Sequence, residues 1–233
     1  KIMKYYYDGA DPSEFSKIIN KGCISGITTN VNFVVDYASK YSINSYFEAI
    51  KPLYEIAAAE GKSIPFSIQA IGETPKEIIS SAIEIKSKFS KGIKLFIKVP
   101  VNFENLYAIK YLSSVEEVNV NATCITSFLQ ASIACSSGAK ILSYFWGKMT
   151  DEGIDPVDHV SSLKKFIDAN KYDAEILCGS IRQSRVIHEA FTAGADIVTL
   201  PFDYFPKISQ RRKSEEATNI FNESWVSSKM TLK

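Results

Sequence analysis

The sequence IPFSIQAIGETPKEIISSAIEIKSKFSKGIKLFIKVP, residues 64–100, contains the repeat that decides the fold. Ile64 to Gln69 is an apolar run of strand length, and Lys94 to Val99 is a second one. Between them, Thr74-Pro75-Lys76-Glu77 is typical of a helix start, and isoleucines recur after it with helical spacing. Two strands joined by a helix predict a parallel pair with a right-handed crossover.

The same alternation continues along the whole chain of 233 residues. Eight predicted strands, each followed by helical sequence, fit a closed barrel better than an open sheet of about five or six strands. We therefore expect an α/β protein: a single (β/α)8 TIM barrel domain over residues 1–233, with a C-terminal helical tail over 207–233. The predicted strands are residues 3–7, 24–28, 64–69, 94–99, 118–122, 140–144, 175–178 and 196–200.

Three connecting segments carry specific expectations. The helical sequence from Asn32 to about Glu60 is predicted to break near Ser42-Ile43-Asn44. Residues 147–155, which follow the sixth strand, are predicted to be a loop because they contain glycine and aspartate. The tail is predicted to be helical from about Lys207 to Trp225.

Composition limits the class of protein. Twenty-seven basic and 26 acidic residues leave a formal charge of +1, so no overall field attracts nucleic acid or an acidic membrane. No apolar run approaches the roughly 18 residues of a membrane span, and the first residues lack the apolar core of a signal peptide. Four scattered cysteines and two histidines form no metal-ligand or disulfide pattern. We expect a cytoplasmic protein without a metal site.

Functional side chains lie at the end of nearly every predicted strand or just after it. In a barrel of this type, the active site lies at the C-terminal ends of the strands. We therefore expect these side chains to converge on one mouth. They are Asp8, Thr28, Asn30, Gln69, Lys98, Asn121, Thr123, Ser143, Phe145, Ser180 and Arg182.

Lys98 is the most informative of these residues, because its strand LFIKVP (residues 95–100) is apolar and a charge there is costly without a role. Burial would lower the pKa of the amine and yield the neutral nucleophile that forms a Schiff base with a carbonyl group. The alternative is a lysine that reaches the rim or pairs with a carboxylate such as Asp8. The other polar strand ends favour the catalytic interpretation.

Asp8 and the nearby cations also admit two interpretations. A carboxylate facing an iminium ion can act as general acid and base in carbon–carbon bond cleavage, but an Asp before Gly9 is also a common loop cap. Arg182 follows the seventh strand, where barrels often bind phosphate, and Lys148 follows the sixth. Together they suit a sugar phosphate, or they are solvated charges at the rim. The neutral amides and hydroxyls suit sugar hydroxyls or a catalytic water, and each alone also fits a turn or a satisfied buried group.

Seven short segments, in a fixed order, resemble the motifs of one family. They are Tyr7-Asp8, like a first-strand aspartate; SGITTN (25–30), like G-[VI]-T-T-N-P; FIKVP (96–100), like the segment with a Schiff-base lysine; NVNAT (119–123), like N-x-N-x-T; SYFWGK (143–148), like S-P-F-x-G-R; CGSIR (178–182), like A-S-[FI]-R; and residues 193–201, like an eighth-strand pattern. The chain thus resembles the transaldolase and fructose-6-phosphate aldolase family, particularly its short members. The match is collinear over nearly the whole chain.

The resemblance implies a class I enzyme that handles a dihydroxyacetone unit of sugar phosphates, with no metal or organic cofactor. In that scheme Lys98 attacks the ketone and forms the imine, while Asp8 takes and returns a proton beside the breaking bond. Gln69 and Thr123 would hold the water that relays protons. The implied substrate contacts are Thr28, Asn30, Asn121, Ser143, Phe145 and Ser180, with Arg182 and Lys148 on the phosphate.

Two enzyme activities remain open at this point. The leading hypothesis is a transaldolase of pentose phosphate metabolism, which transfers dihydroxyacetone from a ketose phosphate to an aldose phosphate. Phe145 and Asn121 resemble the transaldolase branch, and Arg182 suits a phosphate. The alternative is an aldolase that releases free dihydroxyacetone. Gln69 favours it, because transaldolases usually have Glu there and a neutral amide cannot take a proton from water.

A third hypothesis belongs to another class: a barrel that only binds sugar phosphates. Three departures from the family motifs suggest it, namely Val31 and Tyr144 in place of proline and Lys148 in place of arginine. The expected partners are small sugar phosphates, with no nucleic acid and no membrane. Short family members assemble as homo-oligomers, pentamers or decamers, and the apolar side chains between Ile220 and Trp225 suit such a contact.

Overall fold

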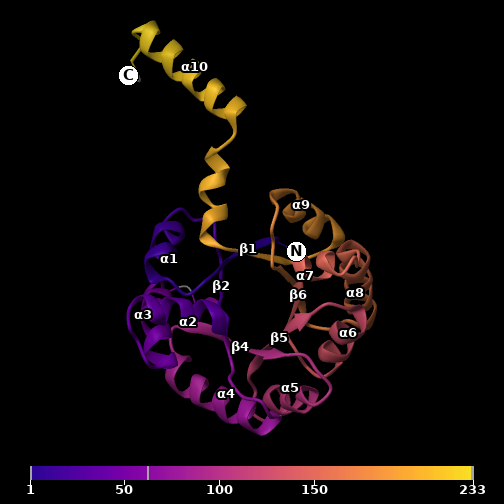
Figure 1. Cartoon of the computed structure of the whole chain (residues 1–233). Coiled ribbons are helices and arrows are strands. Elements are labelled where there is room, and N and C mark those ends of the chain that lie inside the picture. Colours follow the sequence, from indigo (N-terminus) through magenta and orange to yellow (C-terminus); the bar gives the residue numbers. More distant parts are fainter. Residues whose placement is uncertain (1, 62, 232–233) are drawn as a thin grey trace.

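The computed structural model describes residues 2–61 and 63–231, in which eight parallel strands close into a barrel (Figure 1). The strand order around the barrel follows the chain, and β8 pairs back to β1. The predicted α/β class and (β/α)8 architecture are confirmed. The strands are β1 (Lys4–Asp8), β2 (Ile27–Thr28), β3 (Ile64–Gln69), β4 (Ile93–Pro100), β5 (Asn119–Ile125), β6 (Ile141–Phe145), β7 (Glu175–Gly179) and β8 (Ile197–Leu200). The α-helices are α1 (Pro12–Ile19), α2 (Val31–Lys40), α3 (Tyr46–Ala59), α4 (Pro75–Phe89), α5 (Asn105–Ser114), α6 (Phe128–Ser136), α7 (Trp146–Asp151), α8 (Pro156–Asn170), α9 (Ser184–Ala193) and α10 (Arg212–Ser228).

Local sequence explains where several helices begin. Asp11, Thr74 and Asp155 each accept a hydrogen bond from a backbone N–H in the first turn of α1, α4 and α8, and a proline follows each of them. The break expected near residues 42–44 is confirmed, because it separates α2 from α3, and Ser45 caps the second of these helices. These caps thus fix the residues at which the helices after the strands begin.

The inside of the barrel contains two layers of side chains. The lower layer is an apolar plug of five buried side chains from β1, β4, β6, β7 and β8, namely Tyr6, Phe96, Ile141, Leu177 and Ile197. Because side chains alternate along a strand, residues two positions further on also face inward. The residues two positions beyond the plug are Asp8, Lys98, Ser143, Gly179 and Thr199, which all line one cavity. The plug is therefore the floor of that cavity.

A larger apolar core lies between the barrel and its helices. Phe15, Leu53, Ile85, Ile109 and Leu163, from five different helices, are almost completely inaccessible to solvent. Burying a side chain of this size stabilises the fold by roughly 1.5–3 kcal/mol. The helices are thereby fixed against the strands, and the strand ends that carry the polar groups are fixed with them.

Three segments differ from the prediction. The β2 ladder is limited to Ile27–Thr28, because residues 24–26 bond to β1 but do not extend the pairing with β3. β5 runs on to Ile125 and contains a bulge between Ala122 and Ile125, where Cys124 has a φ of 61°. Residues 147–155 were predicted to be a loop, but most of α7 lies there. A helix of six residues is too short to give a periodic apolar pattern.

The tail was correctly predicted to be helical, although it starts as two short 3-10 helices, Phe202–Tyr204 and Pro206–Ser209. Figure 1 shows α10 standing clear of the barrel, and none of its residues is buried. Among the described residues, no helix has the length and apolar character required to cross a membrane.

Candidate active site

A cavity of about 290 Å³ opens above the plug, at the C-terminal ends of the strands. A volume of this size suits a small organic ligand. Nine of the twelve side chains that the sequence nominated line it: Asp8, Thr28, Asn30, Lys98, Thr123, Ser143, Phe145, Lys148 and Ser180.

Lys98 lies on β4 with only 5% of its surface exposed, and its Nζ donates a hydrogen bond to the carbonyl oxygen of Thr29 at 2.8 Å. Burial lowers the pKa of Lys98 below its ordinary value of 10.5, and the nearby Asp8 and Cys124 oppose this effect. No direct ion pair between Lys98 and Asp8 occurs in the described part of the chain. Burial thus shifts Lys98 toward its neutral form, the form in which an amine is nucleophilic.

Asp8 ends β1 and is held by a chain of hydroxyl groups. Thr28 Oγ1 donates to Asp8 Oδ1 at 2.8 Å and lies 2.6 Å from Thr199 Oγ1. Because the single proton of Thr28 goes to Asp8, Thr199 is the donor to Thr28. Burial raises the pKa of Asp8 above its ordinary value of 3.8, against the opposing effects of Lys98 and Thr28. Asp8 and Lys98 are thus both shifted toward their neutral forms.

Thr199 was not identified from the sequence, although a signal existed. It is the penultimate residue of the predicted eighth strand, and the rule that polar strand ends face the mouth selects it as readily as the other residues.

Thr123 lies on β5 beside the bulge and lines the cavity. Its Oγ1 is buried and has no hydrogen-bond partner of standard geometry among the described residues. Buried hydroxyls almost always have a partner, so an unsatisfied one at a cavity wall marks a place for a water or a substrate oxygen.

Asn121 and Gln69 do not line the cavity, unlike the other nominated amide, Asn30. Asn121 is fully buried, donates to Ser67 Oγ at 3.0 Å and accepts from Ser143 Oγ at 2.6 Å. It therefore fixes Ser143 in place without lining the cavity itself. Gln69 is half-buried, and strand register places it beside Lys98, which in turn pairs with Asn121.

Asn30 has two roles in the structure. It lines the cavity, and its Oδ1 also caps α2 by accepting a hydrogen bond from the Phe33 N–H at 3.1 Å. The amide nitrogen of Asn30 is the part left to face a ligand.

The two nominated cations lie in different places. Lys148 lines the cavity, whereas Arg182 lines a neighbouring cavity of about 430 Å³ between α7, α8 and α9. Both terminal nitrogens of Arg182 bind the carboxylate of Asp151, with Nη2 2.6 Å from Oδ2. Asp151 was not singled out by sequence reasoning, because no local pattern links it to a residue 31 positions away.

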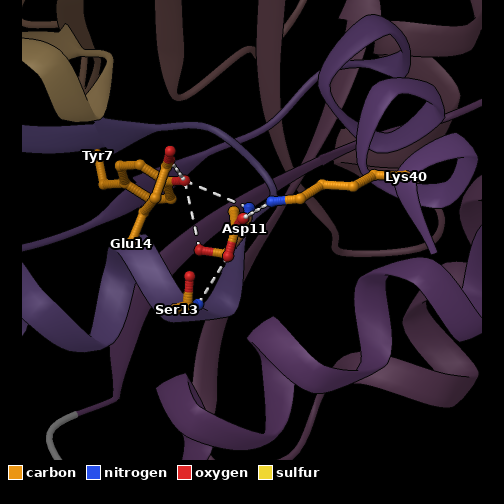
Figure 2. A network of polar contacts seen from close by, with 5 residues as sticks. All are labelled: Tyr7, Asp11, Ser13, Glu14 and Lys40. Carbon is orange, nitrogen blue, oxygen red and sulfur yellow. Dashed lines mark hydrogen bonds and ion pairs between the residues drawn. The ribbon is translucent and has the colours of Figure 1, made fainter.

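A polar network on the outer face of β1 fastens the loop that follows Asp8 (Figure 2). The Tyr7 hydroxyl donates to a Glu14 carboxylate oxygen at 2.7 Å and accepts from the Asp11 N–H at 3.3 Å. The Asp11 carboxylate also lies 3.5 Å from Lys40 Nζ. Burial, followed by the charge and hydrogen bond of Glu14, raises the pKa of Tyr7, so its hydroxyl stays protonated and can donate.

The fold and this cavity define a (β/α)8 barrel with its polar groups gathered at the catalytic face used by barrel enzymes. A model of the Transaldolase/Fructose-6-phosphate aldolase family matches residues 5–231, so the chain belongs to that family.

The names of three curated relatives are consistent with this family. "Probable transaldolase 2" of Listeria monocytogenes is 30% identical over 223 residues, which is 96% of each chain. "Probable transaldolase" of Streptococcus equi subsp. zooepidemicus is 30% identical over 227 residues, 97% of this chain and 100% of that one. "Probable transaldolase" of Thermoplasma volcanium is 29% identical over 223 residues, 96% of this chain and 95% of that one. The protein is an enzyme of the transaldolase and aldolase class, as the sequence predicted.

Proposed function

We propose that the protein is a class I transaldolase, which transfers a dihydroxyacetone unit from a ketose phosphate to an aldose phosphate through a Schiff base on Lys98. One observation carries the proposal: a lysine with 5% exposure lies inside the barrel, in the same cavity as Asp8. Burying an amine is costly unless it has a role. The names of the relatives and the family support sugar phosphates as substrates.

The chemistry begins with attack of the neutral Lys98 amine on the ketone carbon of the donor. The hydroxyl of the resulting carbinolamine takes up a proton from solvent and leaves as water, which gives the iminium ion. Ionised Asp8 then takes the proton of the hydroxyl beside the scissile bond, the carbon–carbon bond breaks, and its electron pair moves into the iminium to form an enamine. The first aldehyde leaves.

The second half-reaction reverses these steps on the acceptor. The enamine carbon attacks the acceptor aldehyde, and Asp8 returns its proton to the new hydroxyl. Water then adds to the iminium and releases the ketose product and free Lys98. Because burial raises the pKa of Asp8 and lowers that of Lys98, each group moves toward the pH range in which it can exchange protons efficiently.

The surrounding residues have supporting roles in this proposal. Thr28 occupies Oδ1 of Asp8, which leaves Oδ2 to meet the substrate proton. Thr123, whose hydroxyl has no standard partner among the described residues, would hold a water near the imine, and Gln69 would assist from its position beside Lys98. The further substrate contacts in the cavity wall would be Asn30, Ser143, Phe145 and Ser180, with Lys148 nearest to the phosphate.

Borohydride reduction in the presence of a ketose phosphate tests the proposal. We expect a stable mass adduct on Lys98, and no adduct on Lys94, an exposed lysine of the same strand. A folded protein that forms no adduct would refute the Schiff-base chemistry and favour a barrel that only binds sugar phosphates.

A second assay separates transfer from simple cleavage. Donor turnover is measured with and without erythrose 4-phosphate as acceptor. A transaldolase turns over only when the acceptor is present, whereas an aldolase releases free dihydroxyacetone without it. The neutral amide of Gln69 is the residue that favours the aldolase alternative.

We also propose that the enzyme is a cytoplasmic homo-oligomer, a pentamer or decamer, in which α10 packs on a neighbouring copy. Phe221 is 72% exposed, Trp225 follows it one helical turn later, and the neighbouring Ile220 and Val226 are also exposed. All four cysteines are free thiols, which fits a reducing compartment. The change Phe221→Asp should lower the mass found by sedimentation velocity; a monomeric wild-type protein would refute the assembly.

A further inference from the structure

The guanidinium group of Arg182 binds a carboxylate of the protein itself, that of Asp151, and does not line the catalytic-face cavity. Both terminal nitrogens bind Asp151, with Nη2 2.6 Å from Oδ2. The same bidentate fork is the feature that makes arginine a strong phosphate ligand. Both side chains of the pair are about half exposed, at 51% and 44%, so solutes can reach it.

Asp151 also acts on the second cation of this rim. It lies three residues after Lys148 on α7, a spacing that puts two side chains on the same side of a helix. Hydrogen bonds from Arg182 and the positive charges of Arg182 and Lys148 hold the pKa of Asp151 below its ordinary value of 3.8, so it is ionised at neutral pH. One negative charge thus offsets both cations that suit a phosphate.

The backbone keeps Arg182 close to the cavity while the pair is formed. The Gly147 N–H donates to the Ser180 carbonyl at 3.1 Å, and a methyl group on Gly147 would lie 2.9 Å from Arg182 Nε. Ser180 itself lines the cavity. Ile181 lines the cavity as well, so Arg182 directly follows two cavity-wall residues, and Asp151 holds its guanidinium.

We propose that Asp151 is a specificity-determining residue. Its carboxylate occupies the guanidinium group of Arg182, and the phosphate of a substrate must displace it in order to bind there. The inference rests on the proposed function, since it assumes phosphorylated substrates. A phosphate dianion carries more charge and more acceptor oxygens than a carboxylate, so it can replace the Asp151 carboxylate on Arg182. The competition lowers affinity for phosphorylated sugars and leaves unphosphorylated sugars unaffected.

Titration calorimetry with inorganic phosphate at low salt tests the inference. We expect Asp151→Asn to bind phosphate about two- to fivefold more tightly than the wild type, the range typical of exposed ion pairs. Glu152→Gln is the matched control, because it removes the same charge from the next residue, and the described structure gives its side chain no contact with Arg182. Its phosphate affinity should change by less than that of Asp151→Asn. The gain should disappear when Arg182→Lys is added to Asp151→Asn.

Three results would overturn the inference. They are unchanged or weaker phosphate binding by Asp151→Asn, an equal gain in Glu152→Gln, and a gain that survives Arg182→Lys. Weaker binding would mean that Asp151 positions Arg182 for the phosphate. Borohydride trapping on Lys98, run on the same proteins with a ketose phosphate, reports the proposed function separately. Adducts without the phosphate effect refute only this inference, whereas the phosphate effect without adducts refutes only the Schiff-base chemistry.

Discussion

Replacing Gly147 with alanine would place a methyl carbon 2.5 Å from the carbonyl oxygen of Ser180 and 2.9 Å from Ser180 Oγ. Ordinary carbon–oxygen contacts begin at about 3.3 Å, so the loop after β7 must move by roughly 0.8 Å. The nearest atom belongs to the backbone, so side-chain rotation cannot relieve the contact. A misplacement of about 1 Å can cost on the order of 100-fold in rate, and we expect kcat/KM to fall by about 10- to 100-fold.

The same substitution should destabilise the fold by about 1–3 kcal/mol, because it overpacks a close contact. Steady-state kinetics with sugar phosphates and thermal unfolding measure the two effects. Gly153→Ala is the control: its methyl group meets nothing within 4 Å, although its φ of 72° is unfavourable for alanine. That variant should lose about 1–2 kcal/mol and keep its kcat/KM. Full kcat/KM in Gly147→Ala would refute the claim that this close approach positions Ser180.

Four further predictions concern the titratable groups around Asp8. Lys98→Met should form no borohydride adduct and keep or gain thermal stability, because it removes a buried amine; a loss of several kcal/mol would indicate a structural ion pair instead. In the wild type, the rate of adduct formation should rise with pH through the lowered pKa of Lys98 and level off below 10.5. Between that lowered pKa and 10.5 the unfolded chain binds more protons, so the free energy of unfolding should also rise with pH, a slope that Lys98→Met should lack. Tyr7→Phe should cost about 1–3 kcal/mol in urea unfolding, because Glu14 loses its donor at 2.7 Å; an unchanged midpoint and slope would show that this network does not stabilise the loop.

The barrel, and the placement of Lys98 and Asp8 in one cavity, could be predicted because each rests on a repeated rule. Eight similar units tolerate errors at single boundaries, as at β2, where the ladder is shorter than its apolar sequence. The alternation of side chains along parallel strands then turns the strand ends toward one cavity. Local periodicity and topology were sufficient for these features.

The partners of individual side chains could not be predicted in this way. Arg182 was expected at the phosphate, but it binds Asp151, and that choice depends on side-chain geometry across two loops. Asn121 was expected to contact substrate, but it does not line the cavity, and its amide oxygen accepts a hydrogen bond from Ser143. α7 was missed because six residues are too few to show a helical period. Long-range pairing and short elements leave no local pattern in the sequence.

The plug of Tyr6, Phe96, Ile141, Leu177 and Ile197 closes the candidate active-site cavity at its lower end. Because packed side chains close the barrel from below, reactants and products would pass through the mouth at the C-terminal ends of the strands. In the proposed transaldolase reaction, the aldehyde released from the donor would leave through the same mouth by which the acceptor enters. The two half-reactions of the proposed transfer would then alternate as in a ping-pong mechanism, so double-reciprocal plots against the two substrates should be parallel lines.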